Sequence, residues 1–312
     1  PTRIADRHED KIFELRKELL DAGLDAGAAT IHWHLARRGE DVPSTSTIWR
    51  VLKSRGFVTP QPHKRPKSSW RRFEAEFPNE CWQADVTHVT VADGQVFEVL
   101  DIIDDHSRLA VASRAFVTTR SADVVRTLHR AAETWGYPES LLTDNGAIFT
   151  ASPRGNDTAA IEPELLSLGI RSKRSRPYHP QTCGKVERFH QTLKNWVAKQ
   201  EPATTKKQLQ RQLDEFTNTY NQQRPHRAIA RRTPAEAFAA REKAQPSGPC
   251  IDTTGWRIRH DRVSKAGNVT IRQAIDAGNG AGSTSAVTIT AATLNASGGS
   301  VEGIDAPITA GS

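Results

Sequence analysis

The chain has 312 residues, of which 37% are hydrophobic and 25% are charged, enough for two or three domains that each bury a core. It carries a formal net charge of +7 and contains no run of about 18 apolar residues, which argues against a membrane-spanning segment. Its three cysteines lie far apart and form no C-x-x-C pair, which favours a reducing compartment and argues against a zinc site. Because the N-terminus lacks an apolar stretch and the chain has no Met, we expect no secretory signal and a missing upstream segment.

Residues 1–58 are expected to form a small helical domain. Apolar residues recur at helical spacing in 8–23, 28–39 and 43–56, and each stretch ends at a glycine. The third stretch begins after Ser44, the expected N-cap, and carries polar and basic residues, which favours a helix-turn-helix that reads DNA. The alternative is a three-helix bundle whose outer face is merely solvated. The candidate DNA contacts are Thr45, Thr47, Arg50 and Lys53.

The middle of the chain is expected to form a mixed α/β sheet. Residues 59–79 are rich in Pro and cations and lack periodicity, which is typical of a linker. From there to residue 243 the apolar pattern predicts first strands and then helices alternating with strands. The expected strands are 82–91, 95–104, 108–117, 139–144 and 170–174, and the expected helices are 122–136 with Ser121 as N-cap, 161–168, 184–199 and 205–222. Three meandering strands followed by this alternation indicate a mixed sheet.

Three carboxylates stand at distinctive places in this expected sheet. Asp85 lies in the middle of the first strand, Asp144 ends the fourth strand, and Glu187 lies in the first turn of the helix 184–199. If they converge, their mutual repulsion requires a cation, and hard oxygen ligands select Mg²⁺ or Mn²⁺. Two such ions would suit phosphodiester chemistry. Singly, each acid has a simpler interpretation, as a turn residue or, for Glu187, as the ion-pair partner of Arg188.

Positive charge is concentrated around Glu187. Residues 171–199 hold eight Lys or Arg residues and one acid. A domain that only needs solubility would intersperse its charges, so this stretch favours binding of a polyanion such as nucleic acid. Lys194 lies seven residues after Glu187, two turns along the same face of the expected helix, where it would contact a bound strand.

Several longer motifs carry a resemblance to a known family. They are CWQAD (81–85), LDIIDDHSR (100–108), LLTDNGAIFT (141–150), SRPYHPQTCGKVERFHQTLKNW (175–196) and YNQQRPHRAI (220–229). Together they resemble the integrase-core transposases of bacterial insertion sequences, the DDE branch of the retroviral-integrase superfamily. The resemblance implies a ribonuclease H-like catalytic core in which Asp85, Asp144 and Glu187 are the catalytic, metal-binding triad, with Mg²⁺ or Mn²⁺ and two ions expected.

The same resemblance implies a reaction and its partners. The chain would cleave double-stranded DNA at transposon ends and transfer the ends into target DNA, without a covalent enzyme intermediate. Gln181 would belong to a loop over the transposon end, and Lys185, Arg188 and Lys194 would bind phosphates. Pairing of two ends implies a homo-oligomer, and a bacterial source implies a cytoplasmic, nucleoid-associated location without a membrane partner.

Other functional interpretations of the sequence remain open. A decayed transposase that only binds transposon ends and a metal-dependent nuclease without strand transfer would both fit the motifs. Ser107 and His106 suggest a hydrolase, although adjacent residues rarely form a catalytic triad and a polar turn is the expected structure. His179 and His190 are expected near the site, where they would touch DNA without being catalytic.

The C-terminal part departs from the family. Residues 244–272 predict the start of a small β-barrel, with a hairpin over 253–272. Residues 273–312 contain no Lys or Arg and are rich in Ala, Gly, Ser and Thr. We therefore expect this atypical tail to be weakly ordered and to derive from a frameshift, a gene fusion or an assembly join; the alternative is a divergent native domain.

Overall fold

A computed structural model of the chain describes residues 6–58, 74–144, 146, 148–149, 161–174, 184–250, 291–294 and 301–304. The chain divides into two compact units, residues 1–258 and 259–312. In the second unit, β6 (Ala291–Leu294) and β7 (Val301–Ile304) pair antiparallel. Of the predicted linker 59–79, residues 59–73 lie outside the described residues. The predictions for Gln181, His179 and the hairpin 253–272 lie outside them as well. Over the part of the chain that is described, no helix combines the length and apolarity needed to cross a membrane.

The N-terminal domain consists of three helices, as the sequence predicts. They are α1 (Asp6–Asp21), α2 (Ala28–Arg37) and α3 (Thr45–Ser54). The side chain of Ser44 accepts a hydrogen bond from the backbone N–H of Thr47 at 3.3 Å, so Ser44 caps α3 as expected. Each helix turns its apolar stripe inward, and the resulting core contains Ile12, Leu15, Leu19, Ile31, Leu35, Ile48, Val51 and Leu52.

The central domain is built on a mixed five-stranded sheet, which confirms the predicted class. Its strands are β1 (Trp82–Thr90), β2 (Val96–Asp104), β3 (Ala110–Phe116), β4 (Ser140–Thr143) and β5 (Arg171–Arg174), in the order β3-β2-β1-β4-β5. The first three strands pair antiparallel, whereas β4 pairs parallel with both β1 and β5. This arrangement brings the middle of β1 next to the carboxyl end of β4.

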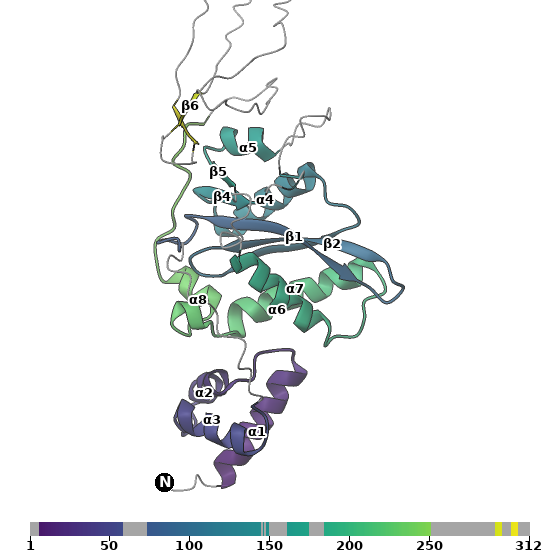
Figure 1. Ribbon diagram of the computed structural model, residues 1–312, viewed down its shortest axis with the longest axis vertical. Coiled ribbons are helices and arrows are strands. Elements are labelled where there is room, and N and C mark those ends of the chain that lie inside the picture. Colours follow the sequence, from purple (N-terminus) through teal and green to yellow (C-terminus); the bar gives the residue numbers. More distant parts are fainter. Residues whose placement is uncertain are drawn as a thin grey trace, which may run out of the picture. The chain divides into compact units, whose positions relative to one another are not determined.

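Helices cover both faces of this sheet (Figure 1). On one face lie α4 (Ser121–Trp135) and α5 (Ile161–Ser167), and on the other lie α6 (Gly184–Val197) and α7 (Lys206–Gln223). A short helical turn, η1 (Arg227–Ile229), and α8 (Pro234–Ala239) follow. The two apolar cores between sheet and helices contain, among others, Leu128 with Leu165 and Phe189 with Phe216. The fold is the three-layer α/β/α arrangement expected for a ribonuclease H-like core.

The start of α4 differs from the sequence prediction. Arg120, and not Ser121, occupies the N-cap position, and its backbone N–H donates to Asp123 Oδ2 at 2.9 Å. The Ser121 hydroxyl instead donates to the carbonyl of Ile148 at 2.7 Å. Ser121 was expected to cap because of its residue type. The acid three residues after Arg120 satisfies the N-cap backbone instead, so the helix begins one residue earlier.

Helix α7 occupies the hydrogen-bonding groups of the edge strand β3. The side-chain amide of Asn221 accepts from Ala110 N and donates to Ala110 O, both at 2.9 Å. The amide of Gln210 likewise accepts from Ala115 N at 2.9 Å and donates to Ser113 O at 3.0 Å. The side-chain amides of Asn221 and Gln210 thus form hydrogen bonds with the outer backbone groups of β3 that a sixth strand would otherwise form.

Replacing Asn221 by Asp is expected to destabilise the fold by about 1–3 kcal/mol. Asn221 is buried, and a carboxylate accepts from Ala110 N but cannot donate to Ala110 O, which would be left unpaired. Equilibrium urea denaturation of both variants measures the effect, with Asn218→Asp as the control because Asn218 is exposed on the same helix. Equal stability of the two variants would show that the Asn221 contact contributes nothing.

Candidate active site and nucleic-acid interface

Asp85 and Asp144 lie next to each other on adjacent parallel strands. The register pairs Ala84 of β1 with Thr143, the last residue of β4. Asp85 follows Ala84 within β1, and Asp144 is the first residue after β4, so the backbone brings the two acids close together. Burial raises the pKa of Asp85; the negative charges of Asp144 and Asp101 act in the same direction, while His190 and the Val86 N–H oppose them. Two carboxylates so close together favour a cation between them.

The chain turns away directly after Asp144. Its Oδ1 accepts a hydrogen bond from Gly146 N at 2.9 Å. A Cβ atom on Gly146 would lie only 2.8 Å from that oxygen, so any larger residue would push against the carboxylate. The glycine two residues after Asp144 therefore leaves room for that carboxylate.

The structure does not gather the third acid, Glu187, with the other two. Glu187 lies in the first turn of α6, as predicted, and its side chain is exposed. Across the described residues, no three His, Cys, Asp or Glu side chains lie close enough together to hold a metal ion. The buried stripe of α6 nevertheless fixes where Glu187 stands on the helix, and this stripe contains Val186, Phe189, Leu193 and Trp196.

A buried acid that sequence reasoning missed lies beside Asp85. Asp101 of β2 is the antiparallel register partner of Asp85, and Ser113 of β3 is in turn the partner of Asp101. The Asp101 side chain is fully buried and its Oδ1 accepts from the Ser113 hydroxyl at 2.6 Å. Asp85, Asp101 and Ser113 thus form a row across three strands. Its sequence signal was an acid between Leu100 and Ile102, both fully buried.

His190 lies between the two acids of this row. Its Nε2 is 3.1 Å from Asp101 Oδ2, and its Nδ1 is 3.8 Å from Asp85 Oδ2. The direction from Nε2 to Oδ2 departs from that of an aligned hydrogen bond, so the two groups are in close polar contact. His190 is buried, and the expectation that it touches DNA stays a prediction.

The DDHSR segment forms a turn, as expected, and not a hydrolase site. Asp104 Oδ1 accepts from both the backbone N–H and the hydroxyl of Ser107, and its Oδ2 accepts from Asn79 N at 2.8 Å. His106 Nδ1 contacts the carbonyl of Ala75 at 2.9 Å. The Ser107 hydroxyl is fully buried and donates to Asp104, so it is not available as a nucleophile.

Lys185 has partners other than those the sequence predicts. Its ammonium forms an ion pair with the fully buried carboxylate of Asp105 and lies 3.3 Å from the Asp105 carbonyl oxygen. The same carboxylate accepts from Gln83 Nε2 at 2.6 Å and from Ala75 N at 2.8 Å. Lys185 thereby ties the first turn of α6 to the turn after β2. Since its side chain is only 17% exposed, a phosphate contact there would compete with this ion pair.

The other cations proposed for DNA are accessible on α6. Arg188 and Lys194 are both exposed, and the Arg188 guanidinium donates to Gln191 Oε1 at 2.8 Å. Gln181, the remaining contact of this group, lies outside the described residues.

The proposed reading helix α3 presents one further large side chain. Thr45, Arg50 and Lys53 are exposed and Thr47 is half-buried, with the Arg50 guanidinium donating to the Thr47 hydroxyl at 3.1 Å. Trp49 is 44% exposed, and the Lys53 ammonium lies 5.0 Å from its ring centroid. Trp49 was not among the predicted contacts, although it stands four residues from both Thr45 and Lys53 and hence on the same helix face.

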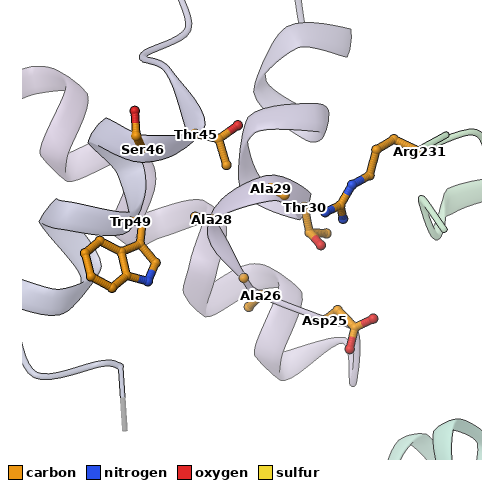
Figure 2. A pocket seen from close by; sticks show the side chains of 10 residues that line it. Asp25, Ala26, Ala28, Ala29, Thr30, Thr45, Ser46, Trp49 and Arg231 are labelled. Carbon is orange, nitrogen blue, oxygen red and sulfur yellow. The ribbon is translucent and has the colours of Figure 1, made fainter. Parts of the chain in front are cut away.

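Figure 2 shows an open depression next to this face, at the N-terminal ends of α2 and α3. Its volume is about 810 Å³. Within the N-terminal domain it is lined by residues that include Asp25, Ala28, Thr30, Thr45, Ser46 and Trp49. The backbone N–H groups of two helix starts are thus found beside exposed hydroxyl and indole side chains.

Two family models match the central domain, which carries Asp85, Asp144 and Glu187. Residues 75–180 match a family model described as an integrase core domain, and residues 168–234 match a second model with the same description. An uncharacterized 31.7 kDa protein of insertion element IS407 from Burkholderia multivorans is 25% identical over 246 residues, 78% of this chain and 86% of that protein. An uncharacterized 39.2 kDa protein of insertion element IS476 from Xanthomonas euvesicatoria is 28% identical over 189 residues, 60% of this chain and 52% of that protein.

Viral proteins and solved structures are also similar to this chain, over shorter alignments or at lower identity. The Gag-Pro-Pol polyprotein of sheep pulmonary adenomatosis virus is 36% identical over 124 residues, 39% of this chain and 7% of the polyprotein. The HTLV-2 integrase catalytic core domain in complex with magnesium, in its trimeric form, is 19% identical with a TM-score of 0.42 and covers 53% of this chain and 99% of that chain. On the family matches and the insertion-element relatives, the chain belongs to the integrase-core superfamily, which includes the retroviral integrases and the transposases of bacterial insertion sequences.

Proposed function

We propose that the chain is a transposase that cuts DNA at the ends of a mobile element and joins those ends to target DNA. The observation that most directly supports this activity is the adjacent pair Asp85 and Asp144 in an integrase-core sheet. The alternatives, a nuclease without strand transfer and an inactive DNA-binding protein, are distinguished by the products that the chain forms.

The residues of the site fit a divalent metal ion. Asp85 and Asp144 supply hard carboxylate oxygens whose negative charges repel each other, and Gly146 leaves the Asp144 carboxylate accessible. Glu187 is the proposed third ligand, because it stands one helical turn before His190, whose ring faces Asp85. When bound, Mg²⁺ or Mn²⁺, as two ions, would activate the attacking oxygen and stabilise the leaving oxygen of a phosphodiester.

The remaining proposed residues bind and orient DNA. Arg188 and Lys194 are exposed cations on the helix of Glu187, where they would hold phosphates of the strand that is cut. Arg50 and Lys53 of α3 would contact the terminal sequence of the element, and Gln181 would lie over its end. Because two element ends must be joined together, the active form is proposed to be a homo-oligomer acting on chromosomal DNA in the cytoplasm.

The test is a joining assay with the purified full-length chain. The substrate is a labelled duplex with the inverted repeats that flank the reading frame, mixed with supercoiled plasmid and Mg²⁺. We expect nicked end duplex and, in addition, label joined to the plasmid. Nicking without joining would show a nuclease, and specific binding without either product would show an inactive DNA-binding protein.

Arg50→Ala is expected to weaken binding to the end duplex by about 1–3 kcal/mol and to leave binding to random DNA nearly unchanged, as for a lost base contact. Lys194→Ala is expected to weaken binding to both duplexes and to reduce the salt slope by about one. Fluorescence anisotropy titrations at several salt concentrations measure both effects. Equal losses on specific and random DNA for Arg50→Ala would contradict base reading by α3.

A further inference from the structure

The row of polar side chains across the sheet contains one carboxylate more than the proposed metal site uses. Asp101 is fully buried, although its neighbours Leu100, Ile102 and Ile103 in β2 are apolar and also buried. Burial of a charge is costly unless a partner compensates it, and an apolar residue at position 101 would avoid that cost. Packing alone therefore does not explain why an acid stands opposite Asp85.

The partner of this buried carboxylate is the imidazole of His190. Asp101 Oδ1 is held by the Ser113 hydroxyl at 2.6 Å, which leaves Oδ2 to meet His190 Nε2 at 3.1 Å. While Nε2 lies near Asp101, the other ring nitrogen, Nδ1, lies 3.8 Å from Asp85 Oδ2. One carboxylate thus fixes the ring, and the ring faces the second carboxylate.

His190 also links two separate elements of the proposed site. It lies on α6 three residues after Glu187, so a single helical turn separates the ring from the proposed third ligand. Asp85 belongs to β1, in the sheet on which α6 packs. Removing a group that contacts a metal ligand and orients it commonly weakens metal affinity about 10–100-fold.

We propose that His190 and Asp101 are a buried positioning pair that fixes the carboxylate of Asp85 and the distance between β1 and the first turn of α6. This inference rests on the proposed function, since it assigns Asp85 to a metal ion. Neither residue touches DNA or the metal in this arrangement. Asp101 holds the imidazole, and the imidazole holds Asp85 in the orientation that metal binding needs.

The first measurement needs no DNA and no activity. Mn²⁺ is titrated into the full-length chain by calorimetry, and the binding that Asp85→Asn removes is taken as the signal. We expect His190→Ala to weaken this binding by roughly tenfold or more, and Asp101→Asn to weaken it in the same direction. The amide of Asp101→Asn keeps the size and the Ser113 contact of the carboxylate but loses the charge that holds the ring.

Two control variants of α6 separate positioning from general damage. Gln191→Ala removes an exposed side chain next to His190 and is expected to leave Mn²⁺ binding unchanged. Leu193→Ala removes a fully buried side chain of the same helix that belongs to the apolar core, so it destabilises the helix without touching the acid row. If Leu193→Ala weakens Mn²⁺ binding as much as His190→Ala does, the pair is merely structural and the inference is overturned.

The same titrations keep this inference apart from the proposed function. Unchanged Mn²⁺ binding in both His190→Ala and Asp101→Asn would overturn the positioning pair, even if the wild-type chain joins DNA. If the wild-type chain never joins DNA but the two variants bind Mn²⁺ more weakly, the positioning pair is supported and the proposed transposase activity is rejected. If His190→Ala does not fold, the same titration is made with His190→Gln and Asp101→Asn. The inference is also overturned if Asp85→Asn binds Mn²⁺ as tightly as the wild-type chain does.

Discussion

Asp85→Asn and Asp144→Asn are each expected to reduce DNA cleavage and joining by roughly three orders of magnitude or more, because the charge that holds the metal ion is removed. The amide keeps the size of the side chain, so the fold and the binding of DNA should be retained. Glu187→Gln is expected to give the same loss, although the structure leaves Glu187 exposed and apart from the pair. Initial rates on labelled end duplex with Mg²⁺ measure all three variants.

The matched control for these variants is Asp214→Asn on α7. Asp214 is an exposed acid whose carboxylate lies 3.6 Å from the Arg114 guanidinium, far in sequence from the proposed ligands. The Asp214→Asn variant is expected to cleave and join DNA at the wild-type rate. A variant of the triad that retained near-normal cleavage would have to be removed from the proposed set of metal ligands.

Phe189→Ala is expected to lower the free energy of unfolding by about 3–5 kcal/mol. The Phe189 ring is 1% exposed and packs against Phe216 and Tyr220 of α7, with ring centroids 5.5 and 5.0 Å apart. Its removal leaves a cavity between α6 and α7 on the face of the sheet that carries Asp85. Guanidinium denaturation, followed by tryptophan fluorescence and by circular dichroism, measures the loss.

Arg188→Ala is the matched control, since the preceding residue of the same helix is exposed. Its unfolding free energy is expected to change by no more than about 0.5 kcal/mol. If Phe189→Ala and Arg188→Ala are equally stable, α6 does not pack on the sheet through its buried apolar residues. The position of Glu187 on the helix would then have no support.

The elements of the fold follow largely from local patterns in the sequence. The apolar spacing of residues 8–56 gives three helices, and Ser44 caps the third because its hydroxyl meets the Thr47 N–H. Short runs rich in apolar and β-branched residues give the first three strands within a few residues of their ends. The prediction that Ser121 caps α4 was wrong, because the backbone N–H of Arg120 donates to the Asp123 carboxylate. The residue type at position 121 does not reveal this contact.

The parts of the site that sequence could not supply depend on pairing between distant residues. Asp101 becomes part of the site only through the register of β1 and β2, which places it opposite Asp85. Lys185 looked like a DNA contact in a basic stretch, but its partner Asp105 lies eighty residues away in sequence. The sequence suggested only that Asp85 and Asp144 could converge, and the parallel register of β1 and β4 brings them together. The place of Glu187 beside them stays a prediction.

The amide contacts of α7 with β3 restrict how copies of this chain can associate. An open strand edge is a template to which another chain adds by backbone hydrogen bonds, and this is a common route to unwanted association. At β3 the groups that such a strand would need, on Ala110, Ser113 and Ala115, are already bonded to Asn221 and Gln210. Copies of this chain therefore cannot join through a continuous sheet at this edge without first displacing α7.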